Sequence, residues 1–341
     1  MSSQRKTADL RHPANRAPSE DAPLSRIGRY RLVRELAGGG MARVYEAWND
    51  AIGRRVAVKV LRPEYANEPE LRQRFFLEAR VTNLVQHPGL VVVHEHGVLD
   101  NGQAFVVMEY LEGETLSRYL LGPSWRLCDA LRLVRQVSAV LRAVHAVGLV
   151  HRDLTPANIM VVSDPEVSGG RRAKLVDLGI AKLNPEALRL LTSCPPGPPA
   201  AALAEGDDNE DDMPTMPMAR PGRLLGTPLY MAPEQIHAPE SVDSAADVYA
   251  LGVILYEIVA GRVPFEGTLT QVLNCHLHTP VPSPRRQNPA APRALGLLIT
   301  AMMAKDPLAR PNLHTVERIL EDLITHEAQP RRARLGWGPL L

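Results

Sequence analysis

Four polar residues, His151, Arg152, Asp153 and Asn158, stand within eight positions in the stretch VHRDLTPANIMVV, residues 150–162. Apolar runs lie on both sides of them, and buried polar groups are costly unless they find partners. A loop that only joins a helix to a strand would explain the pattern without chemistry. A catalytic loop would explain it as well, because a carboxylate can accept the proton of an attacking hydroxyl and an amide oxygen can bind a metal ion.

Three residues elsewhere in the chain could act together with this cluster. Lys59 lies in the strand-like sequence VAVKV, where apolar neighbours leave a lysine either to reach solvent or to pair with an acid. Glu78, in the helix expected next, is the candidate partner, and a solvated helix residue is the alternative. Asp177 follows an apolar run, and together with Asn158 it would supply the hard oxygen ligands that Mg²⁺ prefers.

A glycine-rich segment, LAGGGMARVY, spans residues 36–45 between two expected strands. Glycines allow backbone amides to approach phosphate groups closely, because no side chain intervenes. The segment therefore suits a phosphate-binding loop. A glycine-rich hairpin without a ligand fits the same pattern.

Hydrophobic periodicity predicts the elements that would position these residues. Alternating or apolar runs predict strands over 28–36, 44–48, 54–61, 90–99 and 103–111. Helical spacing of apolar residues predicts one helix between Pro69 and His87, and after Gly113 it predicts helices over 128–148, 248–260 and 294–304. The sequence thus predicts an α+β chain, with a small sheet-rich part followed by a larger, mainly helical part.

Composition limits the classes of function. The chain has 341 residues, of which 45% are hydrophobic, and its 39 basic and 38 acidic residues give no overall field that would attract nucleic acid. Three scattered cysteines predict neither a disulfide framework nor a zinc site. The N-terminal segment has no apolar signal core, and apolar runs such as 250–256 are far shorter than the roughly 20 residues that cross a bilayer. We therefore expect a soluble, cytoplasmic protein without membrane insertion.

The order of several motifs resembles the protein kinase family, most closely the bacterial serine/threonine kinases of eukaryotic type. The resemblance runs from about Tyr30 to about Thr325 and depends on AVK, Glu78, MEYLEG, HRDLxxxN, DLG, GTPLYMAPEQ, DVYALG and the arginine in DPLARPN. It implies the bilobal protein kinase fold over residues 28–326, with an N-lobe over 28–112 and a C-lobe over 113–326. We expect a disordered leader over 1–27, a disordered acidic insertion over about 193–222 and a short basic tail over 327–341.

The resemblance implies an enzyme that uses ATP and Mg²⁺ to phosphorylate Ser and Thr hydroxyls of protein substrates and of itself. Asp153 would be the catalytic base, Asn158 and Asp177 would bind Mg²⁺, and Lys59, paired with Glu78, would hold the α and β phosphates. A dimer formed for autophosphorylation is left open. The expected ATP-binding set is Leu36, Ala37, Gly38, Gly39, Gly40, Met41, Ala42, Arg43, Val44, Ala57, Lys59, Glu78, Met108, Glu109, Leu111 and Met160.

The resemblance also assigns structural and regulatory roles. Glu234 would pair with Arg310, and Asp247 would support the backbone of the HRD segment. Arg152, directly before Asp153, implies control by phosphorylation, because a phosphate could pair with it. Thr215 is the preferred phosphate acceptor.

Four positions depart from the family pattern. One is Leu178 in DLG, where the family usually has phenylalanine, and it changes only a packing residue. Ala37 and Ala42 stand where the family usually has glycine, and Thr155, also counted among the catalytic residues, stands where it usually has lysine. Loss of that cation could cost on the order of 3 kcal/mol, or about two decades in rate. A pseudokinase scaffold is therefore the main alternative, and a small-molecule kinase is a second. His94 and His96 share one strand face, and metal binding there lacks a third ligand.

Overall fold

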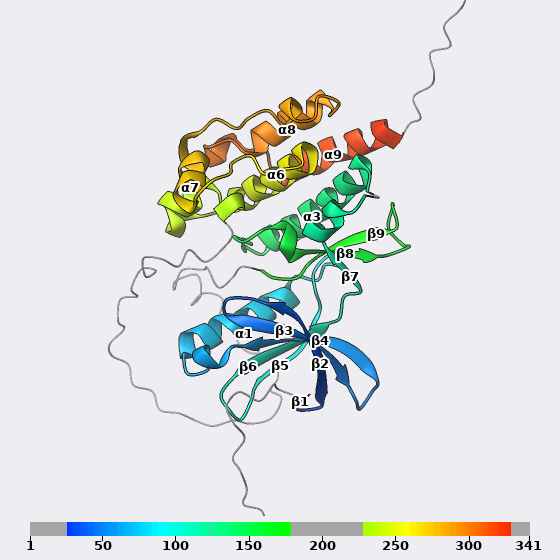
Figure 1. Cartoon of the computed structure of the whole chain (residues 1–341), viewed down its shortest axis with the longest axis vertical. Coiled ribbons are helices and arrows are strands. Elements are labelled where there is room, and N and C mark those ends of the chain that lie inside the picture. The colour runs from blue at the N-terminus through cyan, green and yellow to red at the C-terminus, as the bar shows by residue number, and fades with distance from the viewer. Residues whose placement is uncertain (1–25, 124, 179–227, 329–341) are drawn as a thin grey trace, which may run out of the picture.

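The structure is a computed structural model that describes residues 26–123, 125–178 and 228–328. Two lobes follow each other along the chain, a sheet with one long helix and then a mainly helical part (Figure 1). This is the predicted α+β, bilobal arrangement. The expected leader lies almost entirely outside the described residues, as does the insertion over 193–222 with Thr215.

The N-terminal lobe is built on a six-stranded antiparallel sheet with the strand order β1-β2-β3-β4-β6-β5. All the strands predicted for this lobe are present, and their ends differ from the prediction by a few residues. A short strand, β1, precedes Gly28 within the described residues and buries Ile27. The strands are β1 (Arg26–Ile27), β2 (Tyr30–Gly38), β3 (Ala42–Asn49), β4 (Arg54–Leu61), β5 (Val93–Val98) and β6 (Ala104–Glu109).

The two faces of strand β4 pack into different hydrophobic clusters. Side chains alternate along a strand, so Val56, Val58 and Val60 share one face and pack into an apolar cluster that also contains Ile27. The opposite face presents Ala57, Lys59 and Leu61. The alternation therefore places Lys59 on the same face as Ala57.

Helix α1 (Pro69–Leu84) packs against this second face of the sheet. Phe75 and Ala79 are buried with Leu61 and Val106 of the sheet. Glu78 lies three residues after Phe75, so it shares the helix face that meets the sheet. Packing of α1 therefore carries Glu78 towards Lys59.

The C-terminal lobe combines a small sheet with helices. Its three strands have the order β7-β8-β9, and β8 and β9 flank the turn that follows the catalytic segment. These elements are β7 (Gly113–Thr115), β8 (Ile159–Ser163), β9 (Arg171–Leu175), α2 (Leu116–Leu121), α3 (Leu127–Ala146), α5 (Pro233–His237), α6 (Ala245–Ala260), α7 (Leu269–His278), α8 (Arg293–Met302) and α9 (Leu313–Ala328). Short 3-10 helices occur in both lobes. One in the N-terminal lobe covers Pro63–Tyr65, and those in the C-terminal lobe cover Pro156–Asn158, Pro228–Tyr230, Pro239–Ser241, Pro284–Arg286 and Pro307–Ala309.

Helix α6 forms the centre of this lobe, with α3 and α8 packed beside it (Figure 1). Nearly all of its residues are buried, as expected for a helix that is apolar on every side. Asp247 is a charged residue among these buried side chains. In the described part of the chain, no helix is both long enough and apolar enough to span a membrane.

Candidate active site

Lys59 lies between two carboxylates contributed by different elements. Its Nζ is 3.1 Å from Glu78 Oε1 on α1 and 2.5 Å from Asp177 Oδ1, two residues after β9. The Glu78 pairing confirms the partner predicted from the sequence and rules out the alternative of a solvated helix residue. Lys59 and Asp177 come from the two lobes, so this ion pair crosses the cleft.

Burial and mutual contact shift the pKa values of Lys59, Glu78 and Asp177 away from their ordinary values. Burial opposes the charge of Lys59, but Asp177 and Glu78 outweigh burial and raise its pKa above the usual value. Burial and then the neighbouring Asp177 raise the pKa of Glu78 well above that of an ordinary glutamate. Burial also opposes ionisation of Asp177, yet Lys59 lowers its pKa to about 2. Asp177 therefore keeps its negative charge at neutral pH.

The segment that contains His151, Arg152 and Asp153 is held by Asp247 of α6. The carboxylate accepts hydrogen bonds from the backbone N–H groups of His151 at 2.8 Å and Arg152 at 2.9 Å, as predicted. His145 Nε2, at the end of α3, lies 2.7 Å from the same carboxylate. Burial opposes ionisation of Asp247, but the hydrogen bond from His145 outweighs it and lowers the pKa of the carboxyl.

This support explains an uncommon backbone conformation. Arg152 has a φ of 62°, in the left-handed region that side chains other than glycine seldom adopt. Such a conformation persists when the surroundings determine it, and here Asp247 binds the consecutive backbone N–H groups of His151 and Arg152. Gln235 adds a third contact, because its Nε2 donates to the Arg152 carbonyl at 2.7 Å. Three hydrogen bonds from two side chains, Asp247 and Gln235, thus hold the segment that presents Asp153.

The amide N–H group of Asn158 is used within the protein. Its Nδ2 donates to the Asp153 carbonyl at 2.9 Å, which leaves the amide oxygen as its acceptor group. Its backbone carbonyl accepts from Val176 N at 3.1 Å, and this bond ties the segment to the residue before Asp177. An amide oxygen and an ionised carboxylate are suitable ligands for Mg²⁺, so the donor set fits the ion.

The predicted adenine site is apolar. Ala57, Val91 and Met108 are buried together, and Val44 and Leu111 pack against them. Met160, from the same predicted set, is half-buried on β8. Val91 was missed by the sequence reasoning, because nothing in its local pattern distinguishes it from an ordinary strand residue.

Glu109, at the predicted hinge, makes its side-chain contacts within the protein. Its carboxylate lies 2.5 Å from Lys174 Nζ on β9 and accepts from Val92 N at 2.8 Å. Lys174 was also missed, although its position three residues before Asp177 placed it near the site. This ion pair is a second contact between the two lobes, besides that of Lys59 with Asp177.

The glycine-rich segment forms the β2–β3 hairpin, closed by a hydrogen bond from Gly39 N to Ala42 O at 2.9 Å. Ala42 is buried with Leu61 and Phe75 in the cluster beneath the sheet. The methyl group of Ala42 is therefore accommodated by the core. Ala37, opposite Val44 in the hairpin, is exposed.

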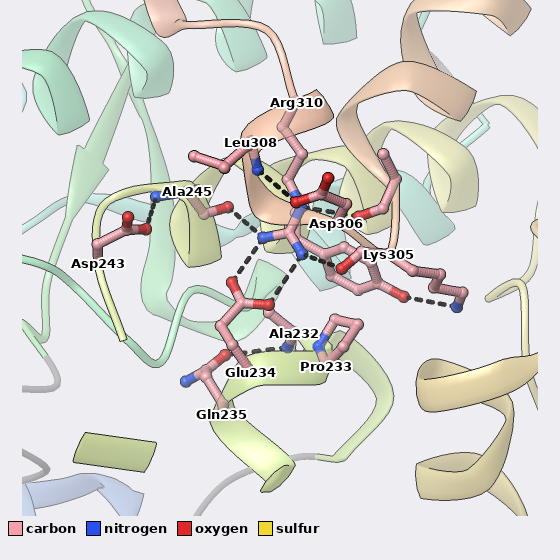
Figure 2. Close-up of polar contacts among 12 residues, drawn as sticks. Ala232, Pro233, Glu234, Gln235, Asp243, Ala245, Lys305, Asp306, Leu308 and Arg310 are labelled. Carbon is pink, nitrogen blue, oxygen red and sulfur yellow. Dashed lines mark hydrogen bonds and ion pairs between the residues drawn. The ribbon is translucent and has the colours of Figure 1, made fainter. Parts of the chain in front are cut away.

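A buried ion pair joins Glu234 of α5 to Arg310, near the end of the C-terminal lobe sequence. Arg310 donates from Nη1 to Glu234 Oε1 at 2.6 Å and from Nη2 to Oε2 at 2.8 Å, and the two side chains are 1% and 7% exposed. Figure 2 shows the pair together with the carbonyl groups of Ala245 and Lys305, which the guanidinium also contacts. The pairing predicted for Glu234 and Arg310 is confirmed.

Thr155 and Leu178, where the sequence departs from the family pattern, are both buried. Thr155 is buried and borders a small cavity with Asp153 and Gln235. Leu178 is buried in the core of the C-terminal lobe, which agrees with a packing role for the residue after Asp177. The candidate phosphate acceptor Thr215 falls outside the described residues.

Comparisons with known proteins agree with this geometry. Residues 30–323 match the family described as protein kinase domain. The chain is 37% identical over 290 residues to the serine/threonine-protein kinase PknA of Mycobacterium tuberculosis, covering 83% of this chain and 58% of that protein. It is 38% identical over 284 residues to the serine/threonine-protein kinase Pkn1 of Myxococcus xanthus, covering 83% of this chain and 36% of that one. The chain thus spans little more than half of the first relative and about a third of the second.

The fold has solved counterparts. The kinase domain of PknI from Mycobacterium tuberculosis superposes with a TM-score of 0.60 at 24% identity, covering 88% of this chain and 99% of that domain. At this identity the superposition supports the fold alone. Taken with the match over nearly all described residues, the conclusion is that this chain belongs to the protein kinase domain family.

Proposed function

We propose that the chain transfers the γ-phosphate of ATP to Ser and Thr hydroxyls of protein substrates. The observation that carries the proposal is the Lys59 ion pair with both Glu78 and Asp177, set opposite a catalytic segment fixed by Asp247. The relatives PknA and Pkn1 are named serine/threonine-protein kinases, which supports the same acceptor type. Since ATP and Mg²⁺ are abundant in the cytoplasm, we propose that the reaction takes place there.

Each residue has one task in the proposed reaction. Asp153 accepts the proton of the substrate hydroxyl and orients that hydroxyl for attack. Lys59 holds the α and β phosphates, and Glu78 keeps Lys59 in position. Asn158 and Asp177 would hold Mg²⁺, which supplies charge neutralisation at the transferred phosphoryl group.

The proposal is tested by incubating the purified chain with γ-labelled ATP and Mg²⁺, followed by analysis of the labelled amino acids. Phosphoserine and phosphothreonine are the expected products. Asp153→Asn is the control, and it should lower the signal by about a hundredfold or more because it removes the base. Equal absence of label in both proteins would support a scaffold that does not transfer phosphate.

Thr155 offers a variant with an expected gain. Thr155→Lys should raise kcat by roughly tenfold to a hundredfold, because a cation beside the transferred phosphoryl group stabilises the transition-state charge. Thr155→Met has a side chain of comparable length without charge and should give no such gain. The measurement is kcat at saturating ATP for all three proteins. An unchanged kcat in Thr155→Lys would mean that another cation already fills this role.

A further inference from the structure

A second cavity lies on the C-terminal lobe, away from the residues that contact Lys59. Its volume is about 290 Å³, and it lies between α3, the turn that joins β8 to β9, and the connection after α1 at residues 87–89. Figure 1 shows α3 alongside β8 and β9. The volume is at the lower end of the range for ligand pockets, about 300 Å³. None of the tasks proposed above uses this cavity.

Three guanidinium groups line the cavity, on Arg132 and Arg135 of α3 and on Arg172 of β9. Among its lining residues there is no carboxylate within the described chain. The acids that pair with these arginines do not line it. Arg132 pairs with Asp129 at 2.9 Å, Arg135 with Glu321 at 2.9 Å, and Arg172 with Asp164 at 2.5 Å.

Each of these ion pairs uses only part of a guanidinium. The hydrogen bond from Arg172 to Asp164 runs from Nε, so the Nη groups of Arg172 are left for other acceptors. Arg135 Nε lies 2.9 Å from Glu321 Oε2 as an ion pair, without hydrogen-bond geometry. In Arg132 the bond to Asp129 runs from Nη1, while the buried Nε has no hydrogen-bond acceptor among the described residues. Part of the hydrogen-bonding capacity of the Arg132 guanidinium is therefore not used by the described residues.

His87 adds a further donor. Its Nδ1 accepts a hydrogen bond from Gly89 N at 3.0 Å, so in the neutral ring the proton is on Nε2. Burial and then the positive charges of Arg172 and Arg142 lower the pKa of His87, and Glu317 opposes this effect. The local potential is therefore positive.

The cavity also has an apolar portion, formed by Pro88, Ala139, Val140 and Val167. A free phosphate ion would leave this portion unused. A phosphorylated side chain with its neighbouring residues would use both portions, because an arginine cluster recognises a phosphoryl dianion by charge-assisted hydrogen bonds and the apolar wall receives the peptide.

We propose that this cavity binds a phosphothreonine or phosphoserine side chain of a polypeptide. Arg132, Arg135 and Arg172 contact the phosphoryl oxygens, and the apolar wall contacts the peptide. The site is a docking site and takes no part in phosphate transfer. Its existence does not depend on catalysis by this chain, so the two proposals fail separately.

The test is a binding measurement on the full chain in an Asp153→Asn background, which keeps its own phosphorylation constant. The probe is the peptide acetyl-Ala-Ala-phosphothreonine-Ala-Ala-amide, titrated by calorimetry beside the unphosphorylated peptide, inorganic phosphate and an eight-residue oligothymidylate. The phosphopeptide should bind at least tenfold more tightly than each of the other three. Equal binding of the unphosphorylated peptide, of phosphate or of the oligonucleotide would overturn the proposal.

Arg135 has a matched control on the same helix. Arg135 and Arg142 lie seven residues apart on α3 and pair with Glu321 and Glu317 of α9 at 2.9 and 3.1 Å, but only Arg135 lines the cavity. Arg135→Gln should weaken phosphopeptide binding about tenfold or more, whereas Arg142→Gln should change it less than twofold. Equal effects of the two variants would contradict the site.

An exposed position gives a test that does not disturb any ion pair. Ser168 lies in the exposed turn between β8 and β9 and borders the cavity. Ser168→Glu places a negative charge there, and Ser168→Gln adds a side chain of the same shape without charge. Binding of the phosphopeptide should be at least tenfold weaker in Ser168→Glu than in Ser168→Gln, and equal affinities would argue against an anion site.

Discussion

Asp177→Asn is expected to lower kcat/KM for protein phosphorylation at least a thousandfold. The substitution removes a carboxylate that stays ionised, with a pKa of about 2, and that would hold Mg²⁺ together with Asn158. Loss of charge neutralisation at a transferred phosphoryl group is worth several kcal/mol, and about 4 kcal/mol corresponds to a thousandfold in rate. The measurement is steady-state phosphorylation at saturating Mg²⁺.

A second readout separates this effect from unfolding. In the wild type, burial and the neighbouring Asp177 hold the pKa of Glu78 well above its usual value. Replacement of Asp177 by asparagine removes the second contribution and leaves the 3.1 Å contact of Lys59 with Glu78, so the pKa of Glu78 should fall. Carbon NMR of the Glu78 carboxyl across pH measures this shift.

Asp50→Asn serves as the control for these experiments. It removes an exposed carboxylate that pairs with Arg26 and Arg31 on the surface of the N-terminal lobe. Its kcat/KM should stay within twofold of the wild type. A comparable loss in both variants, or an Asp177→Asn protein with nearly full activity, would refute the role of Asp177.

Arg310→Met is expected to lower the free energy of unfolding by about 3–5 kcal/mol. The substitution leaves Glu234 buried without its bidentate partner, and an uncompensated buried charge is strongly destabilising. It also removes the donors that reach the Ala245 and Lys305 carbonyls. The measurement is urea unfolding followed by circular dichroism.

Two further variants test the cause of this loss. In the double variant Glu234→Met/Arg310→Met, much of the stability should return, because the pair is replaced by apolar side chains and no charge is left buried. Arg318→Met removes an exposed pair with Asp322 at 3.8 Å and should cost less than about 1 kcal/mol. A loss of under 1 kcal/mol in Arg310→Met would show that the buried pair contributes little.

The sequence predicted the site well where spacing carried the information. Apolar neighbours placed Lys59 in a strand and pointed to an acid as its partner, and Glu78 of the following helix is that partner. Asp247 and the Glu234–Arg310 pair followed from the family motifs. These relations are local, or they are properties of a shared fold.

The contacts that sequence reasoning missed join segments distant in the chain. Lys174 pairs with Glu109 across 65 positions, and His145 reaches Asp247 across 102. Each residue alone looks like an ordinary charged or polar residue of a strand or helix. The packing of the lobes brings them together, and neither periodicity nor spacing encodes that packing.

The contacts that hold Asp153 lie within one lobe, whereas the contact of Lys59 with Asp177 joins the two lobes. Asp153 is fixed by Asp247 and Gln235, which belong to the same lobe as the catalytic segment, whereas Lys59 reaches Asp177 from the other lobe. A movement of one lobe against the other would therefore separate Lys59 from Asp177 and would leave the contacts that hold the Asp153 segment intact. In the reaction proposed above, the nucleotide could then exchange without a change in the position of the proposed base.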